Sequence, residues 1–225
     1  MAKIIDKVFL VPGGVANPYI IVDRAGLTII DAGFPRNGKK ILAYVASLGK
    51  SARDVKRIII THADLDHFGG LAALQDASGA LTFASQIEAD AIAKGTSSRE
   101  IRAKGFSPRR ILFSLLSPFV KATPFQVHEI IVEGQALPVL GGLQVLETPG
   151  HTPGHISLFA PSAGVLFCGD SMISDDKGLK GSRPGITWDE PKARSSERKQ
   201  AQLRAKIVCP GHGPVVRDAT GKFPV

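Results

Sequence analysis

Five of the six histidines in this chain lie in three short loops, and this clustering constrains the fold more than any other feature of the sequence. Each loop follows a stretch whose residue pattern predicts a β-strand. The loops are residues 61–67 (THADLDH), 149–155 (PGHTPGH) and 210–214 (PGHGP). Imidazole and carboxylate groups are the usual ligands of zinc and related divalent ions, and loops at strand ends can converge without disturbing the core. The sequence therefore predicts a metal centre built from three loops.

The first loop offers more ligand-type residues than a single metal ion uses. His62, Asp64, Asp66 and His67 fall within six residues, and the other two loops add further histidines. Two ions about 3.5 to 4 Å apart, sharing a bridging carboxylate and a water, would explain the surplus. Asp170 is expected at the end of a strand and suits the bridging role. We therefore expect two divalent metal ions per chain.

The chain alternates strands and helices in two similar halves. In the first half we expect strands at 4–11, 19–23, 27–31, 55–61 and 81–84, and helices at 38–48, 68–76 and 86–94. In the second half we expect strands at 143–148, 156–160, 165–168 and 206–209, and a polar helix at 191–205. Each half has one strand ending in Asp and Gly and a later strand entering a His loop. Two such halves would pack as two sheets covered by helices. The functional residues would lie at the edge where the two sheets meet, which we call the seam.

Length and composition favour one globular domain over residues 1–225. Apolar residues make up 44% of the chain and charged residues 21%, which argues against disorder. Cys168 and Cys209 cannot form a disulfide framework, so we expect buried strand residues and a reducing compartment, the cytoplasm. The uncharged run at 148–169 contains three prolines and two histidines, so we expect no membrane span.

Residues 95–121 fit neither half of the pattern. The segment begins basic and then turns apolar, as in residues 109–120 (RRILFSLLSPFV). We predict a helical cap that selects a small-molecule substrate with an anionic and an apolar part; a homodimer interface is the alternative. The stretches 94–121 and 177–206 each carry a net charge of +6, against +8 for the whole chain. Nucleic acid therefore stays open as a partner, although solvated helix surface is the simpler interpretation.

In this order and spacing, the motifs make the sequence resemble the metallo-β-lactamase superfamily. The matching segments are 31–33 (DAG), 61–70 (THADLDHFGG), 148–155 (TPGHTPGH), 169–170 (GD) and 210–213 (PGHG). The resemblance implies an α+β fold, a four-layer αββα sandwich of two mixed sheets flanked by helices, with the metal site at one edge. It also implies a ligand set: His62, residue 64 and His151 for the first metal, Asp66, His67 and His212 for the second, and Asp170 as the bridge.

The chain departs from the usual family motif at Asp64, where the family has a third histidine. An anionic oxygen favours iron or manganese more than an imidazole does, so we expect zinc, with these two metals as alternatives. We place His155 outside the ligand set, and Asp31 as a residue that orients a ligating histidine. The isolated His128 is expected to have no part in the site.

The resemblance and the ligand set together predict a dinuclear metal-dependent hydrolase. A metal-bridging hydroxide would cleave an ester, lactone or thioester, with Asp66 as the catalytic residue that orients the nucleophile. Only 13 residues follow His212, which argues against the usual form of glyoxalase II, and residues 171–173 lack the tyrosine usual in homoserine lactonases. A phosphodiesterase or nuclease of the same fold, a di-iron redox protein and a non-catalytic metal-binding protein are the alternatives.

Overall fold

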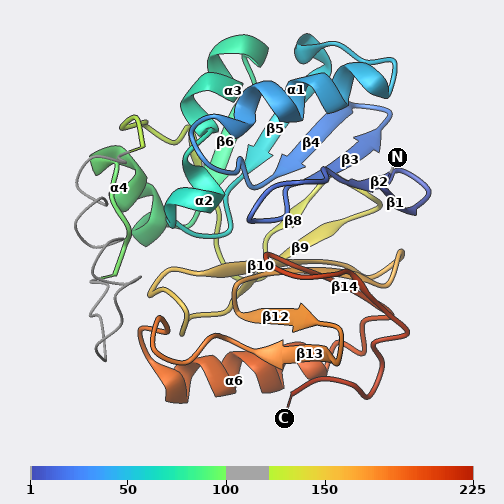
Figure 1. Ribbon diagram of the computed structural model, residues 1–225, viewed down its shortest axis with the longest axis vertical. Helices are drawn as coiled ribbons and strands as arrows, with labels where there is room; N and C mark the ends of the chain where they lie inside the picture. The colour runs from blue at the N-terminus through green and yellow to red at the C-terminus, as the bar shows by residue number, and fades with distance from the viewer. Residues whose placement is uncertain (1, 100–121, 225) are drawn as a thin grey trace.

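A computed structural model describes residues 2–99 and 122–224 of the chain. Its strands form two mixed sheets stacked face to face, and helices cover the outer face of each sheet (Figure 1). This is the four-layer αββα arrangement of the α+β class that the sequence predicts. Because the two sheets come from the two halves of the chain, any site at their shared edge draws on both halves.

The first sheet has seven strands in the order β1 to β7. They are β1 (Ala2–Ile5), β2 (Val8–Leu10), β3 (Tyr19–Asp23), β4 (Gly26–Ile30), β5 (Val55–Ile59), β6 (Leu81–Ala84) and β7 (Glu129–Ile130). Strands β1 to β4 form an antiparallel meander, whereas β4 to β7 run parallel. The expected single strand at 4–11 is instead a hairpin, because Asp6 and Lys7 interrupt the apolar run and Lys7 takes a φ of 69° in the turn.

The second sheet has six strands in the order β15-β14-β11-β10-β9-β8. They are β8 (Ala136–Leu137), β9 (Leu143–Glu147), β10 (Ile156–Ala160), β11 (Val165–Gly169), β14 (Ile207–Pro210) and β15 (Val216–Arg217). Only β11 and β14 pair in parallel. A separate hairpin of β12 (Met172–Asp175) and β13 (Gly178–Gly181) follows β11. The sequence does not predict this hairpin, since its two short strands, MISD and GLKG, show no apolar alternation.

The helices lie outside the two sheets. Helices α1 (Asn37–Ser47) and α3 (Leu71–Ser78) cover the first sheet, and α6 (Glu190–Ala201) covers the second (Figure 1). Two helical segments are short, the 3-10 helix η1 (Ala52–Asp54) and α2 (Leu65–Phe68). Helix α4 (Gln86–Lys94) matches its predicted range. The predicted helical cap begins with turn and bend residues at 95–99 instead of helix. Its remainder, residues 100–121, lies outside the described residues.

Three apolar layers separate the four structural layers. Neighbouring residues of one strand point into different layers: Ile29 packs under the helices of the first sheet, and Ile30 packs between the sheets. In β11, Phe167 packs between the sheets, while Leu166 faces the α6 side. This two-residue alternation is what a strand buried on both faces requires. It fixes the register of the strands that end at the seam.

Each half contains an equivalent pair of parallel strands that ends at the seam. Strand β4 pairs in parallel with β5, and β11 pairs in parallel with β14. Parallel strands end at the same edge of their sheet, so the residues after all four strands meet there. Asp31 and His62 follow the first pair, and Asp170 and His212 follow the second. The predicted duplication is therefore present in the strand order.

No helix in residues 2–99 or 122–224 combines the length and the apolar character needed to cross a membrane.

Candidate metal centre

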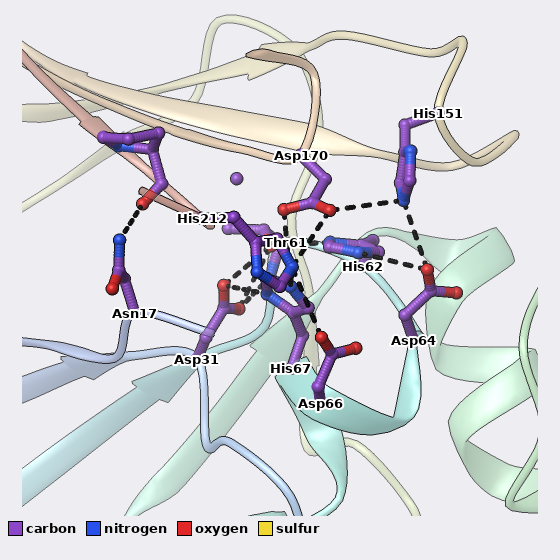
Figure 2. A network of polar contacts seen from close by, with 12 residues as sticks. Asn17, Asp31, Thr61, His62, Asp64, Asp66, His67, His151, Asp170 and His212 are labelled. Carbon is purple, nitrogen blue, oxygen red and sulfur yellow. Dashed lines mark hydrogen bonds and ion pairs between the residues drawn. The ribbon is translucent and has the colours of Figure 1, made fainter. Parts of the chain in front are cut away.

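All the predicted ligand side chains meet at the edge where the two sheets join. Figure 2 shows His62, Asp64, Asp66 and His67 below the loops of the second half, which supply the remaining ligands. Their imidazole nitrogens and carboxylate oxygens form three overlapping clusters. The clusters are His62, Asp64 and His151; Asp66, His67 and His212; and His62, His67 and Asp170. The first two clusters are the two ligand triads that the sequence predicts, and we call them the first group and the second group.

The atoms of the first group have the spacing of metal ligands. Asp64 Oδ2 lies 3.6 Å from His62 Nε2 and 3.2 Å from His151 Nε2. Ligands bound tetrahedrally at about 2.0 to 2.1 Å stand about 3.3 to 3.4 Å from one another. The first group could therefore hold one ion with little rearrangement.

The second group has a similar spacing. His212 Nε2 lies 3.3 Å from Asp66 Oδ2 and 3.4 Å from His67 Nε2. Two imidazole nitrogens that point at each other at this distance need a proton or a cation between them. The second group could therefore hold a second ion beside the first.

Asp170 stands between the two groups. Its Oδ2 lies 3.3 Å from His212 Nε2 and 3.6 Å from His151 Nε2, and its Oδ1 lies 3.4 Å from His67 Nε2 (Figure 2). One carboxylate thus reaches histidines of both groups. This is the position that a bridging ligand needs.

The four histidines of the two groups all present Nε2 to the centre, because each Nδ1 faces an acceptor outside it. His67 Nδ1 lies 2.8 Å from Asp31 Oδ2, and His212 Nδ1 lies 2.9 Å from the Val15 carbonyl oxygen. In the first group the acceptors are hydroxyl oxygens, Thr61 Oγ1 at 3.0 Å from His62 Nδ1 and Ser182 Oγ at 3.1 Å from His151 Nδ1. Partners of this kind fix the tautomer and the ring orientation of a ligating histidine.

Two buried atoms at the centre have no hydrogen-bond partner within the part of the chain that the structure describes. They are His62 Nε2 and Asp170 Oδ1. Buried polar atoms without partners cost free energy, so they are uncommon unless an ion or ligand completes them. Both atoms belong to the clusters that could hold a metal ion.

The charges at the centre also favour cations. Burial would raise the pKa of Asp170, but His67 and His212 hold it well below the usual value. Burial would lower the pKa of His67, but Asp31, Asp170 and Asp66 raise it well above the usual value. For His212, Asp170 and Asp66 outweigh burial and raise the pKa to about 9. In the metal-free protein, protons therefore occupy positions where cations would bind.

The residues that the sequence places outside the ligand set do lie outside it. His155 Nε2 accepts from the Asp170 amide at 3.0 Å, and its Nδ1 contacts Thr148 Oγ1 at 2.9 Å, so neither nitrogen is available to a metal. Asp31 contacts His67 Nδ1, as a residue that orients a ligand should. Cys168 and Cys209 are buried strand residues, and His128 bonds to Thr82 away from the site.

The loop that carries His212 is held by the first half of the chain. The Asn17 side chain donates to the carbonyls of Pro210 and Gly213 at 3.0 and 2.7 Å, and its backbone amide donates to the Gly211 carbonyl at 2.8 Å. Tyr19 adds a bond to the Pro210 carbonyl at 2.7 Å. The second group is therefore positioned by both halves.

Glu88 of α4 ties the first ligand loop to the second, a contact that the sequence analysis missed. Its buried carboxylate accepts from the Ala63 amide at 2.7 Å and from Thr152 Oγ1 and the Gly154 amide at 2.7 and 2.9 Å. An acidic residue in the first turn of a helix usually faces solvent, so the pattern gave no reason to single it out. Its contacts join the loops on either side of the seam.

Arg99 was also missed, because it begins a basic stretch that is typical of a solvated surface. It is 7% exposed, and its Nη2 lies 2.5 Å from Asp64 Oδ2 and 3.1 Å from His151 Nε2. A guanidinium thus lies against two of the three ligands of the first group. No sequence signal distinguishes this arginine from the others nearby.

The comparisons with known proteins agree with the geometry. The profile of the metallo-beta-lactamase superfamily matches residues 11–212. A probable metallo-hydrolase of Bacillus subtilis, YflN, is 28% identical over 221 residues, 88% of this chain and 81% of that protein. A hydroxyacylglutathione hydrolase of Idiomarina loihiensis is 30% identical over 129 residues, 56% of this chain and 36% of that enzyme.

A solved structure shares the fold over nearly the whole chain. A metallo-beta-lactamase family protein of Thermus thermophilus superimposes with a TM-score of 0.74 at 23% identity, covering 97% of this chain and 77% of that one. The family uses divalent metal ions, and two groups of His and Asp ligand atoms converge at the seam of this fold. The chain therefore belongs to the metallo-beta-lactamase superfamily.

Proposed function

We propose that this protein binds two divalent metal ions and cleaves an ester, lactone or thioester bond in a small molecule. The observation that supports this most is the position of Asp170, whose two oxygens reach histidines of both groups at 3.3 to 3.6 Å. A carboxylate shared in this way is the mark of a two-metal site. A site for one structural ion would need neither the second group nor the bridge.

The ligand roles follow from the two groups. His62, Asp64 and His151 would hold the first ion, Asp66, His67 and His212 the second, and Asp170 would bridge them. When bound, two such ions lower the pKa of a shared water and polarise the carbonyl that it attacks. The surrounding residues keep this set rigid, since Asp31, Thr61 and Ser182 each hold a ring nitrogen outside the centre.

Asp66 has a second task in this proposal. Its side chain is 21% exposed, more than the other ligand side chains, and its Oδ2 is the oxygen that faces His212. Oδ1 points away from the contacts that Figure 2 draws. This oxygen can orient the attacking water and pass its proton to the leaving group.

The surface beside the centre fits a substrate with an apolar and an anionic part. Val15 and Trp188 are exposed apolar residues, and their backbones bond to His212 and His151. The Lys192 ammonium lies 4.7 Å from the centre of the Trp188 ring, so a positive charge accompanies this apolar side chain. The similarity to a hydroxyacylglutathione hydrolase supports thioesters as the first substrates to test.

Zinc is the metal that we propose, with iron or manganese as alternatives because of Asp64. An oxygen in place of an imidazole makes the first group harder than a site with three histidines. The reducing compartment expected from the two cysteines stays a prediction.

The test is metal analysis of protein purified without added metal, followed by assays on a panel of esters, lactones, thioesters and bis-p-nitrophenyl phosphate. We expect two ions per chain at saturation and the highest activity on one of the acyl substrates. Asp66→Asn should remove most of this activity, while Asp6→Asn, at an exposed turn residue, should not. Activity on the phosphodiester alone would replace the acyl proposal, and an inactive protein that holds two ions would favour a redox or binding role.

A further inference from the structure

The turn after α4 places a protein cation at the first ligand group. Arg99 lies at the end of this turn, and three contacts fix its side chain. Its Nη2 lies 2.5 Å from Asp64 Oδ2 and 3.1 Å from His151 Nε2, and its Nε donates to the His151 carbonyl oxygen at 2.8 Å. A side chain held in this way is part of the centre and not of the solvated surface.

The guanidinium engages the same atoms that a metal ion needs. Arginine offers only donors, so the His151 Nε2 that faces it presents its lone pair. That lone pair and Asp64 Oδ2 are two of the three ligand atoms that the first group offers to an ion. The other oxygen, Asp64 Oδ1, accepts from Ser97 Oγ at 2.8 Å. Both oxygens of Asp64 are therefore bonded by the one turn at 95–99.

Among the described residues, no arginine or lysine pairs with a carboxylate of the second group. Within residues 2–99 and 122–224, the ion pairs of Asp66 and Asp170 involve only histidines. Asp64 is the one ligand carboxylate of this part of the chain that pairs with an arginine. The donor geometry also differs, because a guanidinium offers several N–H donors in a planar fork and an imidazole does not.

From these contacts we propose that Arg99 competes with a metal ion for the ligands of the first group, which we call the first position. The two metal ions then bind in a fixed order, the second group before the first. The second group binds its ion tightly, and the first group binds one only when the guanidinium leaves Asp64 Oδ2. The first position is then the weaker site, and its occupancy depends on the metal concentration. This inference rests on the proposed two-metal function and specifies how that site is filled.

A purely supporting role for Arg99 predicts the opposite sign. If the guanidinium only positioned Asp64 as a ligand, its removal would leave the carboxylate less ordered and weaken metal binding. Competition predicts tighter binding at the first position, because the group that occupies Asp64 Oδ2 is gone. The direction of the change therefore separates the two roles.

The experiment is a zinc titration of the metal-free chain of residues 1–225, followed by calorimetry and elemental analysis. We compare the wild type with Arg99→Met and with Arg194→Met, a control on the exposed face of α6. The wild type should show one tight and one weak step. Arg99→Met should bind the weak ion about tenfold more tightly, as expected when a charged hydrogen bond no longer competes. Arg194→Met should match the wild type.

Thermal unfolding supplies a second measurement that does not depend on activity. Without metal, Arg99→Met should melt at a lower temperature than the wild type, because Asp64 loses its cationic partner. At saturating zinc the difference should disappear or reverse. Arg99→Lys, which keeps the charge but loses the planar fork, should fall between the two and serves as the test if Arg99→Met does not fold.

Three results would separate the competition from the two-metal proposal. Two equally tight steps in the wild type, or weaker zinc binding in a folded Arg99→Met, would overturn the competition while the two-metal proposal stands. Zinc bound by neither the wild type nor Arg99→Met would overturn the two-metal proposal itself. One tight ion in the wild type and two in Arg99→Met would support both.

Discussion

The two ligand groups use the same kinds of side chain but are supported differently. In the second group, the carboxylate of Asp31 holds His67 Nδ1 at 2.8 Å. In the first group, the hydroxyls of Thr61 and Ser182 hold the two histidines. A carboxylate behind an imidazole makes it a stronger ligand than a hydroxyl does. The two positions are therefore unequal even before the guanidinium on the first one is considered.

The largest effect is expected at Asp170, because its carboxylate belongs to both groups and so does not distinguish them. Asp170→Ala should lose metal from both positions and reduce hydrolysis on the order of a thousandfold, because both ions lose a charged ligand. Elemental analysis after dialysis measures the loss. His155→Ala removes the acceptor of the Asp170 amide and a contact with Thr148 but no metal ligand, so it should retain more metal. Equal loss in the two variants would mean that Asp170 does not bridge.

Asp31→Asn should affect the second position first. The amide keeps the shape but removes the negative charge behind His67, and such changes typically weaken metal affinity about tenfold to a hundredfold. In a zinc titration the tight step should weaken and approach the weak one. An unchanged tight step would show that His67 does not depend on Asp31 for its ligand strength.

Glu88→Gln is the matching change for the first position. Its carboxylate accepts from the loops that carry His62 and His151, so the amide loses charge-assisted bonds on both sides of the seam. We expect the first group to bind its ion several-fold more weakly and the second group to change less. The free energy of unfolding should fall by about 1 to 3 kcal/mol. Denaturant unfolding together with the titration measures both. If the second step weakened more than the first, the assignment of Glu88 to the first position would be wrong.

The smallest effect on the amount of bound metal is expected for Asp64→His, which restores the usual family residue. The variant should fold and shift the first position toward zinc over manganese or iron, because imidazole suits zinc and an anionic oxygen is removed. Competition between metals, analysed position by position, measures the shift. The second position should keep its preference, and an unchanged preference at both would show that Asp64 is not a ligand.

The fold was largely predictable because strand alternation and His-loop spacing are local features of the sequence. Strand β10 and helix α4 match their expected ranges, since each has a clear apolar pattern with a turn residue at its ends. The hairpin of β12 and β13 was not predictable, because its two short strands (MISD and GLKG) carry no apolar alternation in their sequence.

The convergence of the ligand side chains followed from their motif spacing, but the contacts around them did not. Arg99 and Asp64 are 35 positions apart, and Glu88 and Gly154 are 66 apart. Neither pair shares a motif, so only the packing of α4 and the turn after it against the seam brings them together. The sequence alone could therefore not predict that a guanidinium lies against the ligands of the first group.

The contacts of Asn17 and Tyr19 with the His212 loop have a consequence for how the molecule unfolds. These two residues belong to the first half of the chain, yet their hydrogen bonds are made to the end of β14 and the loop that follows it in the second. Opening the seam would break these bonds and separate His67 from His212 in the same event. We therefore expect the halves to melt together, so that a probe placed in either sheet reports the same midpoint.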